Sequence, residues 1–214
     1  MVRVWCVLIG YAFGLFQTSY IYGRMHGIDI REHGSGNAGT TNMMRTLGKK
    51  AGFLTFAGDC LKCVLAVALA RLCFGKAYPD MVPLLEIYAA AGTILGHNFP
   101  FYLGFKGGKG IAATAGLILS FNWIMILCGL ATFLGAFLTT HYVSLGSLLV
   151  YVGFVIELVI LGQCGYFHMS QGHLLELYAV GVFLAAMAFW KHRENIKRLL
   201  AGTERKIFLS SKKK

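Results

Sequence analysis

The sequence of 214 residues contains few charged residues and few prolines. Charged side chains make up 14% of the chain, and only nine of them are acidic, whereas an average soluble domain has about 25% charged residues. With three prolines and no low-complexity stretch, the composition excludes a disordered or collagen-like chain. The hydrophobic share is 57%, which is above the roughly 45–50% of soluble domains. We therefore expect one integral membrane domain over residues 1–214.

The positive charges are concentrated in three polar stretches. Of the 20 Lys and Arg residues, 16 lie in residues 24–50, 97–110 and 191–214, and the long apolar runs hold almost none. Because cationic loops of membrane proteins face the cytoplasm, we expect all three stretches on that side. The net charge of +11 then reflects membrane orientation and not nucleic-acid binding. The end of the last stretch, Lys212–Lys214, should be attracted to anionic inner-leaflet lipids.

The apolar runs predict the membrane-spanning helices. The run from Ile111 to Thr139 is longer than the roughly 20 residues that one span needs, and the segment from Ser120 to Asn122 interrupts it. We therefore divide it into a short broken helix and a full one. The resulting all-α fold has seven transmembrane segments, an outside N-terminus and a cytoplasmic C-terminus: Val4–Tyr22, Phe53–Phe74, Val82–Gly96, Ile111–Leu119, Trp123–Leu138, Leu148–Gly162 and Leu174–Trp190. The alternative is five full spans, with short segments that only dip into the bilayer.

Cysteine and histidine show no pattern of a metal or redox site. The six cysteines have no framework spacing, and the Cys60-x-x-Cys63 pair lies inside an apolar run, as is typical of small residues in a helix bundle. His168 and His173 are two imidazoles without further ligands nearby in the sequence. We therefore predict no cofactor and no metal.

The first polar stretch, GSGNAGTTNMMRTLG (34–48), has the composition of an anion-binding loop. It contains GxGxxG, but a dinucleotide site needs a preceding β-strand, and here a membrane helix precedes the glycines. Glycine permits positive φ, so that successive backbone amides can converge on an anion. Side-chain donors suited to phosphate accompany these amides: Ser35, Asn37, Thr41, Asn42 and Arg45. The alternative is a flexible loop that caps a helix.

The second stretch, GHNFPFYLGFKGGKGIAAT (96–114), is rich in glycine and carries two lysines. Gly107, Gly108 and Gly110 surround Lys109, and Lys106 precedes them. The Walker A motif is not matched, but the turn opens directly into an apolar helix whose N-terminus offers donors and a positive dipole end. A plain cytoplasmic loop would explain the lysines but not three glycines in four positions. We interpret this stretch as a phosphate site.

The third stretch, KHRENIKRLLAGTE (191–204), predicts a basic amphipathic helix that ends at Gly202. His192 and Asn195 are three residues apart and would share a helix face. The alternative is a plain headgroup anchor, but His192 is the best candidate for acid–base chemistry or phosphate contact. A shorter segment, HYVSLGS (141–147), adds the hydroxyl groups of Ser144 and Ser147.

Together these stretches resemble the motifs of the bacterial acyl-phosphate-dependent glycerol-3-phosphate acyltransferase family (PlsY). SGNAGTTN (35–42) is similar to the family's SGNPGATN-like motif, GHNFPFYLGFKGGKGIAAT to GHxFPxxxxFKGGKGxAT, and HRENIKRLLAGTE (192–204) to HRENIxRLLxGTE. The likeness covers essentially the whole chain. It departs from the family pattern at positions that remove no candidate ligand: Ala38, Thr40, Cys63 and His141.

The resemblance implies the first committed step of bacterial phospholipid synthesis. In that reaction, acyl phosphate donates a fatty acyl group to the sn-1 hydroxyl of glycerol 3-phosphate, and lysophosphatidic acid and inorganic phosphate are formed. The implied glycerol-3-phosphate ligands are Ser35, Arg45, Lys106, Ser144, His192 and Asn195, of which Ser35, Lys106, His192 and Asn195 are the expected catalytic residues. The implied acyl-phosphate ligands are Asn37, Thr41, Asn42, Gly107, Gly108, Lys109 and Gly110.

The resemblance also implies a multi-pass protein of the bacterial inner membrane with its active site facing the cytoplasm. We expect a monomer that meets inner-leaflet lipids and has the enzyme that makes acyl phosphate as a candidate partner. No carboxylate is visibly poised beside His192, so we favour the substrate phosphate over His192 as the general base. The roles of Asp59, which could pair with Lys62 one turn away, and of Glu157 stay open.

Three other functions were weighed against this one. Other glycerolipid acyltransferases use a His with an Asp five positions on, and no His in this sequence has that spacing. A transporter of an anionic metabolite would place its charged sites near the midplane and show internal repeats, and the sequence shows neither. A lipid-binding scaffold would explain the basic C-terminal stretch but not the two Gly-rich loops.

Overall fold

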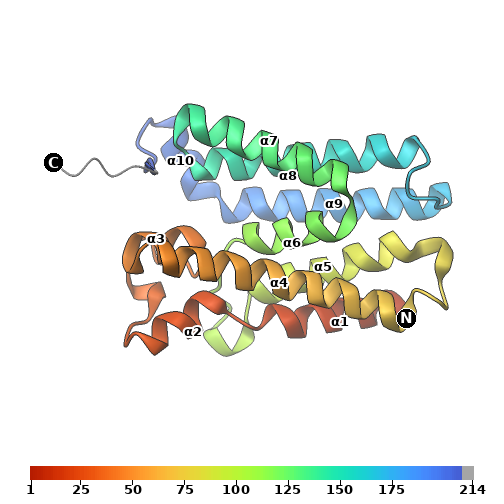
Figure 1. Cartoon of the computed structure of the whole chain (residues 1–214), viewed down its shortest axis with the longest axis horizontal. Coiled ribbons are helices and arrows are strands. Elements are labelled where there is room, and N and C mark those ends of the chain that lie inside the picture. Colours follow the sequence, from red (N-terminus) through yellow and green to blue (C-terminus); the bar gives the residue numbers. More distant parts are fainter. Residues whose placement is uncertain (209–214) are drawn as a thin grey trace.

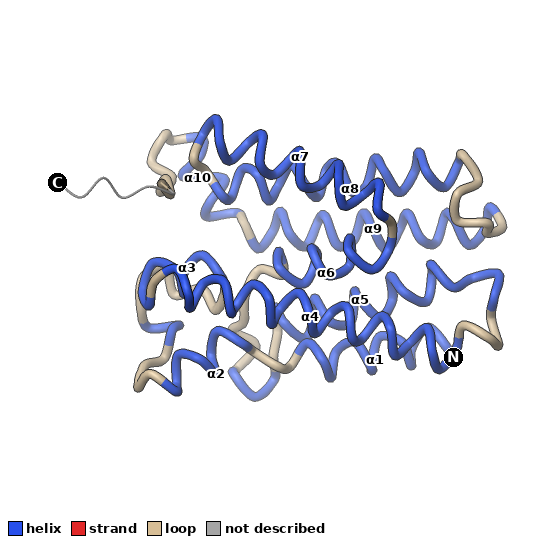
Figure 2. Tube along the Cα trace, viewed as in Figure 1, coloured by secondary structure: helices blue, strands red, loops and turns tan. Residues whose placement is uncertain are grey.

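The computed structural model describes residues 1–208, and every regular element in that range is a helix. Long helices run side by side, and most of their connections lie towards the two ends of the bundle, whereas those between α1 and α2 and between α6 and α7 lie within its length (Figures 1 and 2). The predicted all-helical fold is thereby confirmed. The lipid-attracting segment Lys212–Lys214 lies outside the described residues.

Eight helices form the body of the bundle, and short elements lie in the connections. The body consists of α1 (Val2–Gly14), α2 (Thr18–Met25), α4 (Lys49–Phe74), α5 (Val82–Asn98), α6 (Ile111–Phe121), α7 (Trp123–Thr140), α8 (Val143–Gln163) and α9 (Gln171–Lys191) in the described part of the chain. The connections contain α3 (Thr40–Leu47) and the 3₁₀ turns η1 (Ile30–Glu32), η2 (Pro79–Met81) and η3 (Phe101–Leu103), and α10 (Arg193–Leu200) follows α9.

Five stretches of the described chain are long and apolar enough to cross a membrane. They are Val2–Met25, Lys49–Phe74, Trp123–Thr140, Val143–Gln163 and Gln171–Lys191. The other two predicted segments form α5, with 17 residues, and α6, with 11 residues. Seven crossings and the sides on which the termini lie therefore stay predictions.

The structure confirms one predicted helix break and adds another. The chain turns at Asn122, whose side-chain oxygen accepts a hydrogen bond of 2.6 Å from the backbone N–H of Ile124 and so caps α7. The prediction of one continuous helix over Val4–Tyr22 was wrong, because α1 ends at Gly14 and α2 begins at Thr18. Between them the fully buried Gln17 side chain donates to the carbonyl oxygens of Gly14 (3.0 Å), Gly96 (3.2 Å) and His97 (3.1 Å).

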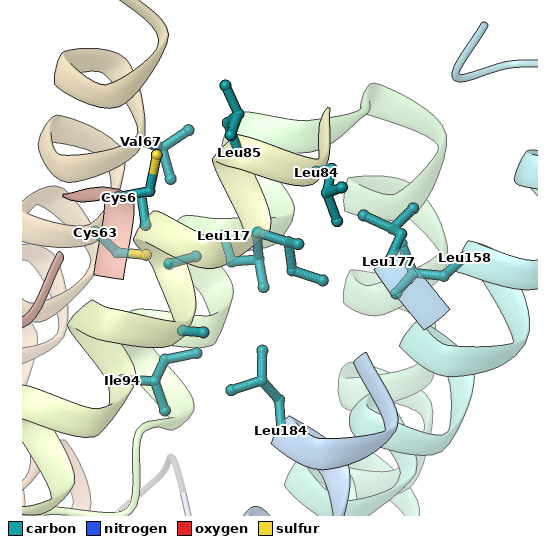
Figure 3. Packing of buried hydrophobic residues seen from close by; sticks show 14 of the residues in the cluster. Cys6, Cys63, Val67, Leu84, Leu85, Ile94, Leu117, Leu158, Leu177 and Leu184 are labelled. Atoms are coloured by element: carbon teal, nitrogen blue, oxygen red, sulfur yellow. The ribbon is translucent and has the colours of Figure 1, made fainter. Parts of the chain in front are cut away.

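Two groups of helices share one core. Figure 1 shows α1, α2, α4 and α5 on one side and α7, α8 and α9 on the other, with α6 between them. Fully buried leucines from four helices meet where the groups join (Figure 3): Leu84 of α5, Leu117 of α6, Leu158 of α8, and Leu177 and Leu184 of α9. The helices α5, α6 and α9 are therefore fixed relative to one another, and the polar stretches continue from the end of α5, the start of α6 and the end of α9.

Helices α1 and α5 approach so closely that only glycine fits at their contact. A Cβ atom added at Gly10 would lie 1.9 Å from the carbonyl oxygen of Ala89, and one added at Gly92 would lie 2.2 Å from that of Val7. Both neighbours are backbone atoms and cannot move aside. Small residues that permit such an approach are typical of helix packing in membranes.

Replacing Gly92 with alanine should destabilise the bundle, because the methyl group would push α1 away from α5. Overpacking of this kind costs about 1–3 kcal/mol. Gly135→Ala in α7 is the matched control, since nothing lies within 4 Å of its added Cβ and alanine favours a helix by up to about 1 kcal/mol over glycine. Thermal unfolding in detergent should show a lower Tm for Gly92→Ala and an equal or higher one for Gly135→Ala. Equal Tm values for the two variants would contradict the packing argument.

Candidate active site

Contacts between the three polar stretches gather them at one end of the bundle, where α2, α3 and α10 lie (Figure 1). The first and second stretches meet at Gly108, where an added Cβ would lie 2.7 Å from the carbonyl oxygen of Ala38. The second and third stretches meet where Lys109 Nζ donates a hydrogen bond to Asn195 Oδ1. The contact between Lys109 and Asn195 joins residues 86 positions apart, and the three stretches form one site.

Asn42 organises the first loop from inside. Its buried side chain accepts a hydrogen bond of 2.8 Å from the backbone N–H of Ser35 and donates to the carbonyl oxygens of Ile30 (3.0 Å) and His33 (2.9 Å). Both amide hydrogens of Asn42 are thus in use, so it has no hydrogen left for a ligand. Asn42 thus holds Ser35 in place, and its contact with acyl phosphate stays a prediction.

The Gly-rich loop is packed against the end of α5. The backbone N–H of Gly107 donates to Asn98 O (3.3 Å) and that of Gly108 donates to His97 O (3.1 Å). A Cβ added at either glycine would lie within 2.1 Å of a His97 atom, so close packing explains why both are glycines. Both amides have acceptors within the protein, and their role as donors to acyl phosphate stays a prediction.

The free donors of this loop lie slightly further along the chain. Within residues 1–208, the backbone N–H groups of Lys109 and Gly110 have no hydrogen-bond acceptor. Gly110 has a φ of +83°, a value that favours glycine, and it is the N-cap of α6. Two free amides therefore lie at the positive end of α6, and the side chain of Lys109 adds a cation to the same loop. Free amides at a helix N-terminus suit phosphate binding.

Glu204 connects the third stretch to the α7–α8 corner. Its Oε1 accepts hydrogen bonds from Ser144 Oγ (2.9 Å) and Asn195 Nδ2 (2.7 Å), and its Oε2 accepts from Arg198 Nε (2.7 Å). Burial raises the pKa of Glu204, but these three hydrogen bonds outweigh it and lower the pKa below the usual value. Sequence reasoning did not single out this residue, although a lone acid near the end of a basic stretch was a usable signal.

His192 lies between α9 and α10 and is only 3% exposed. Its Nδ1 is 2.8 Å from the carbonyl oxygen of Ala188; because a carbonyl only accepts, Nδ1 carries the hydrogen and Nε2 is left as an acceptor. Burial and the nearby Lys109 charge lower the pKa of His192 to about 4. His192 is therefore neutral at pH 7 and suited to accept a hydrogen bond. The predicted helix is interrupted at this residue, since α10 begins at Arg193.

The remaining predicted residues lie around this cluster. Arg45, on α3, is exposed and close enough to Glu204 and Lys109 to interact with them electrostatically. Ser35 and Lys106 are exposed, and their side chains make no hydrogen bond or ion pair with another described residue. Asn37 and Thr41 are half-buried in the first loop and at the start of α3.

Residues 4–202 match the family model described as glycerol-3-phosphate acyltransferase. The chain belongs to the glycerol-3-phosphate acyltransferase family. A family member from Alkaliphilus metalliredigens is 41% identical over 208 residues, which cover 97% of each chain. One from Clostridioides difficile is 44% identical over 202 residues, which cover 94% of this chain and 93% of the relative.

Solved structures of a relative agree with this assignment. The crystal structure of PlsY (YgiH), an integral membrane glycerol 3-phosphate acyltransferase, in its glycerol 3-phosphate form, has a TM-score of 0.82 and 31% identity. The match covers 97% of this chain and 96% of that one. The lysophosphatidic acid form of the same protein has a TM-score of 0.80. The present acyltransferase is therefore an integral membrane enzyme that acts on glycerol 3-phosphate, and its family serves phospholipid synthesis.

Substrate binding by this acyltransferase should weaken at alkaline pH because Lys109 loses its charge. Burial and the nearby cation Arg198 lower the pKa of Lys109 to about 8. The ammonium is present below that pH and lost above it, so the KM of the phosphate substrate bound there should rise roughly tenfold by pH 9. In Lys109→Arg the rise should disappear, because a guanidinium stays charged.

Lys197→Arg is the matched control for this prediction. Lys197 lies on the exposed side of α10, 3.3 Å from Glu194, and so the variant should keep the wild-type rise in KM. The measurement is KM for each substrate between pH 7 and 9.5. A KM that stays flat in the wild type, or a rise that persists in Lys109→Arg, would contradict the assignment.

Proposed function

We propose that this acyltransferase takes its acyl group from a fatty acyl phosphate and transfers it to the sn-1 hydroxyl of glycerol 3-phosphate. The hydroxyl oxygen attacks the acyl carbonyl carbon, the bond from that carbon to the phosphate oxygen breaks, and the hydroxyl proton passes to a phosphate. The products are lysophosphatidic acid and inorganic phosphate. An acyl phosphate is a mixed anhydride and already activated, so positioning and charge neutralisation carry most of the catalysis.

The observation that carries the proposal is the position of Lys109. Its backbone amide and that of Gly110 are free at the N-terminus of α6, and its ammonium donates to Asn195 of the third motif. A phosphate on this loop would thus lie next to the buried His192–Asn195 segment. Two phosphate-bearing substrates need two anion sites, and the first loop with Arg45 supplies the second.

We assign the substrates to these two parts of the site. Acyl phosphate is held by Lys109 and Gly110, with Asn37 and Thr41 from the first loop, while Gly107 and Gly108 serve by letting the loop pack on α5. The ligands of glycerol 3-phosphate are Ser35, Arg45, Lys106, Ser144, His192 and Asn195. Ser144 and Asn195 donate to Glu204 in the structure. Asn195 keeps one amide hydrogen for the substrate, and the hydroxyl oxygen of Ser144 can accept a hydrogen bond from a glycerol hydroxyl.

The site faces the cytoplasm of a bacterial inner membrane in this proposal. Its support is that the three cationic stretches lie at one end of the bundle, as the positive-inside rule requires (Figure 1). Seven crossings, with α5 and α6 as the short ones, place the N-terminus on the opposite side. The substrates then arrive from the cytoplasm and the inner leaflet, where the enzyme that makes acyl phosphate would be the partner of a monomeric acyltransferase.

The choice of donor can be tested with the purified enzyme in detergent. Glycerol 3-phosphate is supplied with palmitoyl phosphate in one reaction and with palmitoyl-CoA in another, and lysophosphatidic acid and phosphate are quantified. We expect both products from palmitoyl phosphate and none from the CoA ester. Product from the CoA ester alone would leave the acyltransferase activity in place and overturn the proposed donor.

The general base can be tested with His192→Gln, whose side-chain oxygen can accept a hydrogen bond near the position of Nε2. With a pKa of about 4, His192 is a weak base at pH 7, whereas a substrate phosphate has a second pKa near 6. We therefore expect kcat within about tenfold of wild type and a higher KM for glycerol 3-phosphate. A loss of kcat of about 10³-fold with unchanged KM would instead identify His192 as the base.

A further inference from the structure

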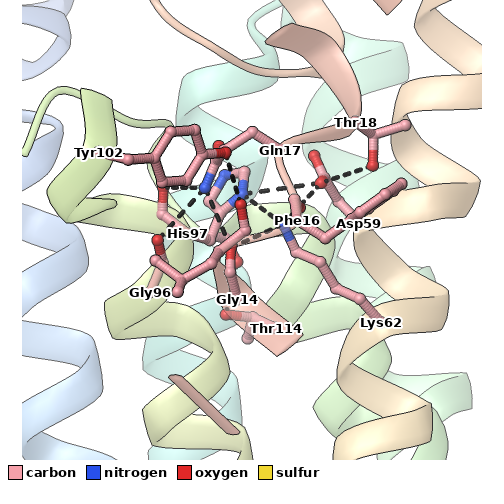
Figure 4. A network of polar contacts seen from close by, with 12 residues as sticks. Gly14, Phe16, Gln17, Thr18, Asp59, Lys62, Gly96, His97, Tyr102 and Thr114 are labelled. Atoms are coloured by element: carbon pink, nitrogen blue, oxygen red, sulfur yellow. Dashed lines mark hydrogen bonds and ion pairs between the residues drawn. The ribbon is translucent and has the colours of Figure 1, made fainter. Parts of the chain in front are cut away.

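A buried polar network lies beneath the Gly-rich loop and takes no direct part in the proposed chemistry (Figure 4). It joins Asp59 and Lys62 of α4 to His97 of α5, and these side chains are 1%, 4% and 3% exposed. Lys62 Nζ lies 2.8 Å from Asp59 Oδ1 and 2.9 Å from His97 Nδ1. Charged and titratable groups are rarely buried inside a membrane protein without a function.

The ammonium group of Lys62 determines which ring nitrogen of His97 carries the hydrogen. An ammonium group has three donors and no lone pair, so His97 Nδ1 must accept from Lys62. The other donors of Lys62 go to Asp59 and to the carbonyl oxygen of Phe16, at 2.7 Å. Neutral His97 therefore carries its hydrogen on Nε2, and the Asp59–Lys62 pair is balanced in charge.

The Nε2 edge of His97 supports the Gly-rich loop. An added Cβ at Gly108 would lie 2.1 Å from Nε2, so the ring edge occupies the space beside this glycine. The backbone of His97 also holds Gly108, because the carbonyl oxygen of His97 accepts a hydrogen bond from the N–H of Gly108 (3.1 Å). Within residues 1–208, His97 Nε2 has no hydrogen-bond partner of its own. The Nδ1 edge of the ring thus meets Lys62, and the Nε2 edge meets the loop.

The α1–α2 junction fixes the network from the other side. Thr18 Oγ1 donates to Asp59 Oδ1 (3.0 Å), and Gln17 Nε2 donates to the carbonyl oxygen of His97 (3.1 Å). The break between the first two helices therefore places donors on both Asp59 and the end of α5. Contacts from the α1–α2 junction, α2 and α4 thus hold the His97 ring at the end of α5 in one position.

We propose that Asp59, Lys62 and His97 form a positioning network that holds Gly108, and through it Lys109 and Gly110, in the geometry that binds the acyl donor. This inference rests on the proposed assignment of that loop to the donor. The network acts through the loop and does not touch the reacting atoms. Because a misplacement of about 1 Å can cost 10²-fold in rate, a network remote from the chemistry can still control it.

The test compares two double substitutions that each remove one ion pair of α4. Asp59→Leu/Lys62→Met removes the pair within α4 that belongs to the network and leaves no unpaired charge. The control, Arg71→Met/Glu86→Leu, removes a different ion pair, which joins α4 to α5 (3.1 Å) and has no contact with the loop. Steady-state kinetics for both substrates and thermal unfolding in detergent are measured for each. His97→Leu, which keeps the Asp59–Lys62 pair, provides the same comparison if the first variant fails to fold.

We expect the network variants to raise the KM for the acyl donor about tenfold or more while the KM for glycerol 3-phosphate stays within about twofold. The control pair should lower the Tm and leave both KM values unchanged. A parallel rise in both KM values, or a control pair that behaves like the network pair, would overturn the proposal.

A spectroscopic measurement tests the network independently of activity. In wild-type enzyme with ¹⁵N-labelled histidine, the ring signals of His97, assigned by their loss in His97→Leu, should show a protonated Nε2 and a bare Nδ1. The preference should weaken in Asp59→Leu/Lys62→Met, and an Nδ1–H form in the wild type would overturn the proposal. If the wild type fails to use palmitoyl phosphate, the proposed donor is wrong; the same KM comparison with the donor that it does use still decides the network.

Discussion

The need to give every buried carbonyl group a donor inside the protein organises this bundle, because a bilayer supplies no water. The break between α1 and α2 frees the carbonyl oxygens of Gly14 and Phe16 in the interior. Gln17 and Lys62 donate to them, and the same two side chains also reach the end of α5. One local break therefore ties α1, α4 and α5 together at the level where the Gly-rich loop begins.

Glycine then sets how closely the elements approach one another. Gly10 and Gly92 let the backbones of α1 and α5 touch, and Gly107 and Gly108 let the loop rest directly on the end of α5. In both places the space for a side chain is filled by other protein atoms. The helix packing consequently determines the position of the loop, and its two free amides belong to Lys109 and Gly110, directly before α6.

The sequence predicted the helices, but it predicted only one of the two breaks described above, the one at Asn122 and not the one between α1 and α2. The polar segment ending at Asn122 signalled a turn, and the side chain of Asn122 does cap α7. Gln17 gave no such signal, because one glutamine in an apolar run is compatible with a helix, and the carbonyl groups that it satisfies belong partly to α5. Tertiary contacts of this kind have no local pattern.

At the site, too, local patterns could be read from the sequence but tertiary contacts could not. The motifs identified the three stretches that meet, but not which of their polar groups are already used. Asn42 and the amides of Gly107 and Gly108 look like ligand donors in the sequence, and only the fold shows that they hold the loops. The polar groups that are not used within the protein include the neutral acceptor His192 and the nearby Lys109 cation. The site therefore carries more positive than negative charge until its phosphate substrates bind. Binding and charge neutralisation are then the same event, which is why an already activated acyl donor suits this arrangement.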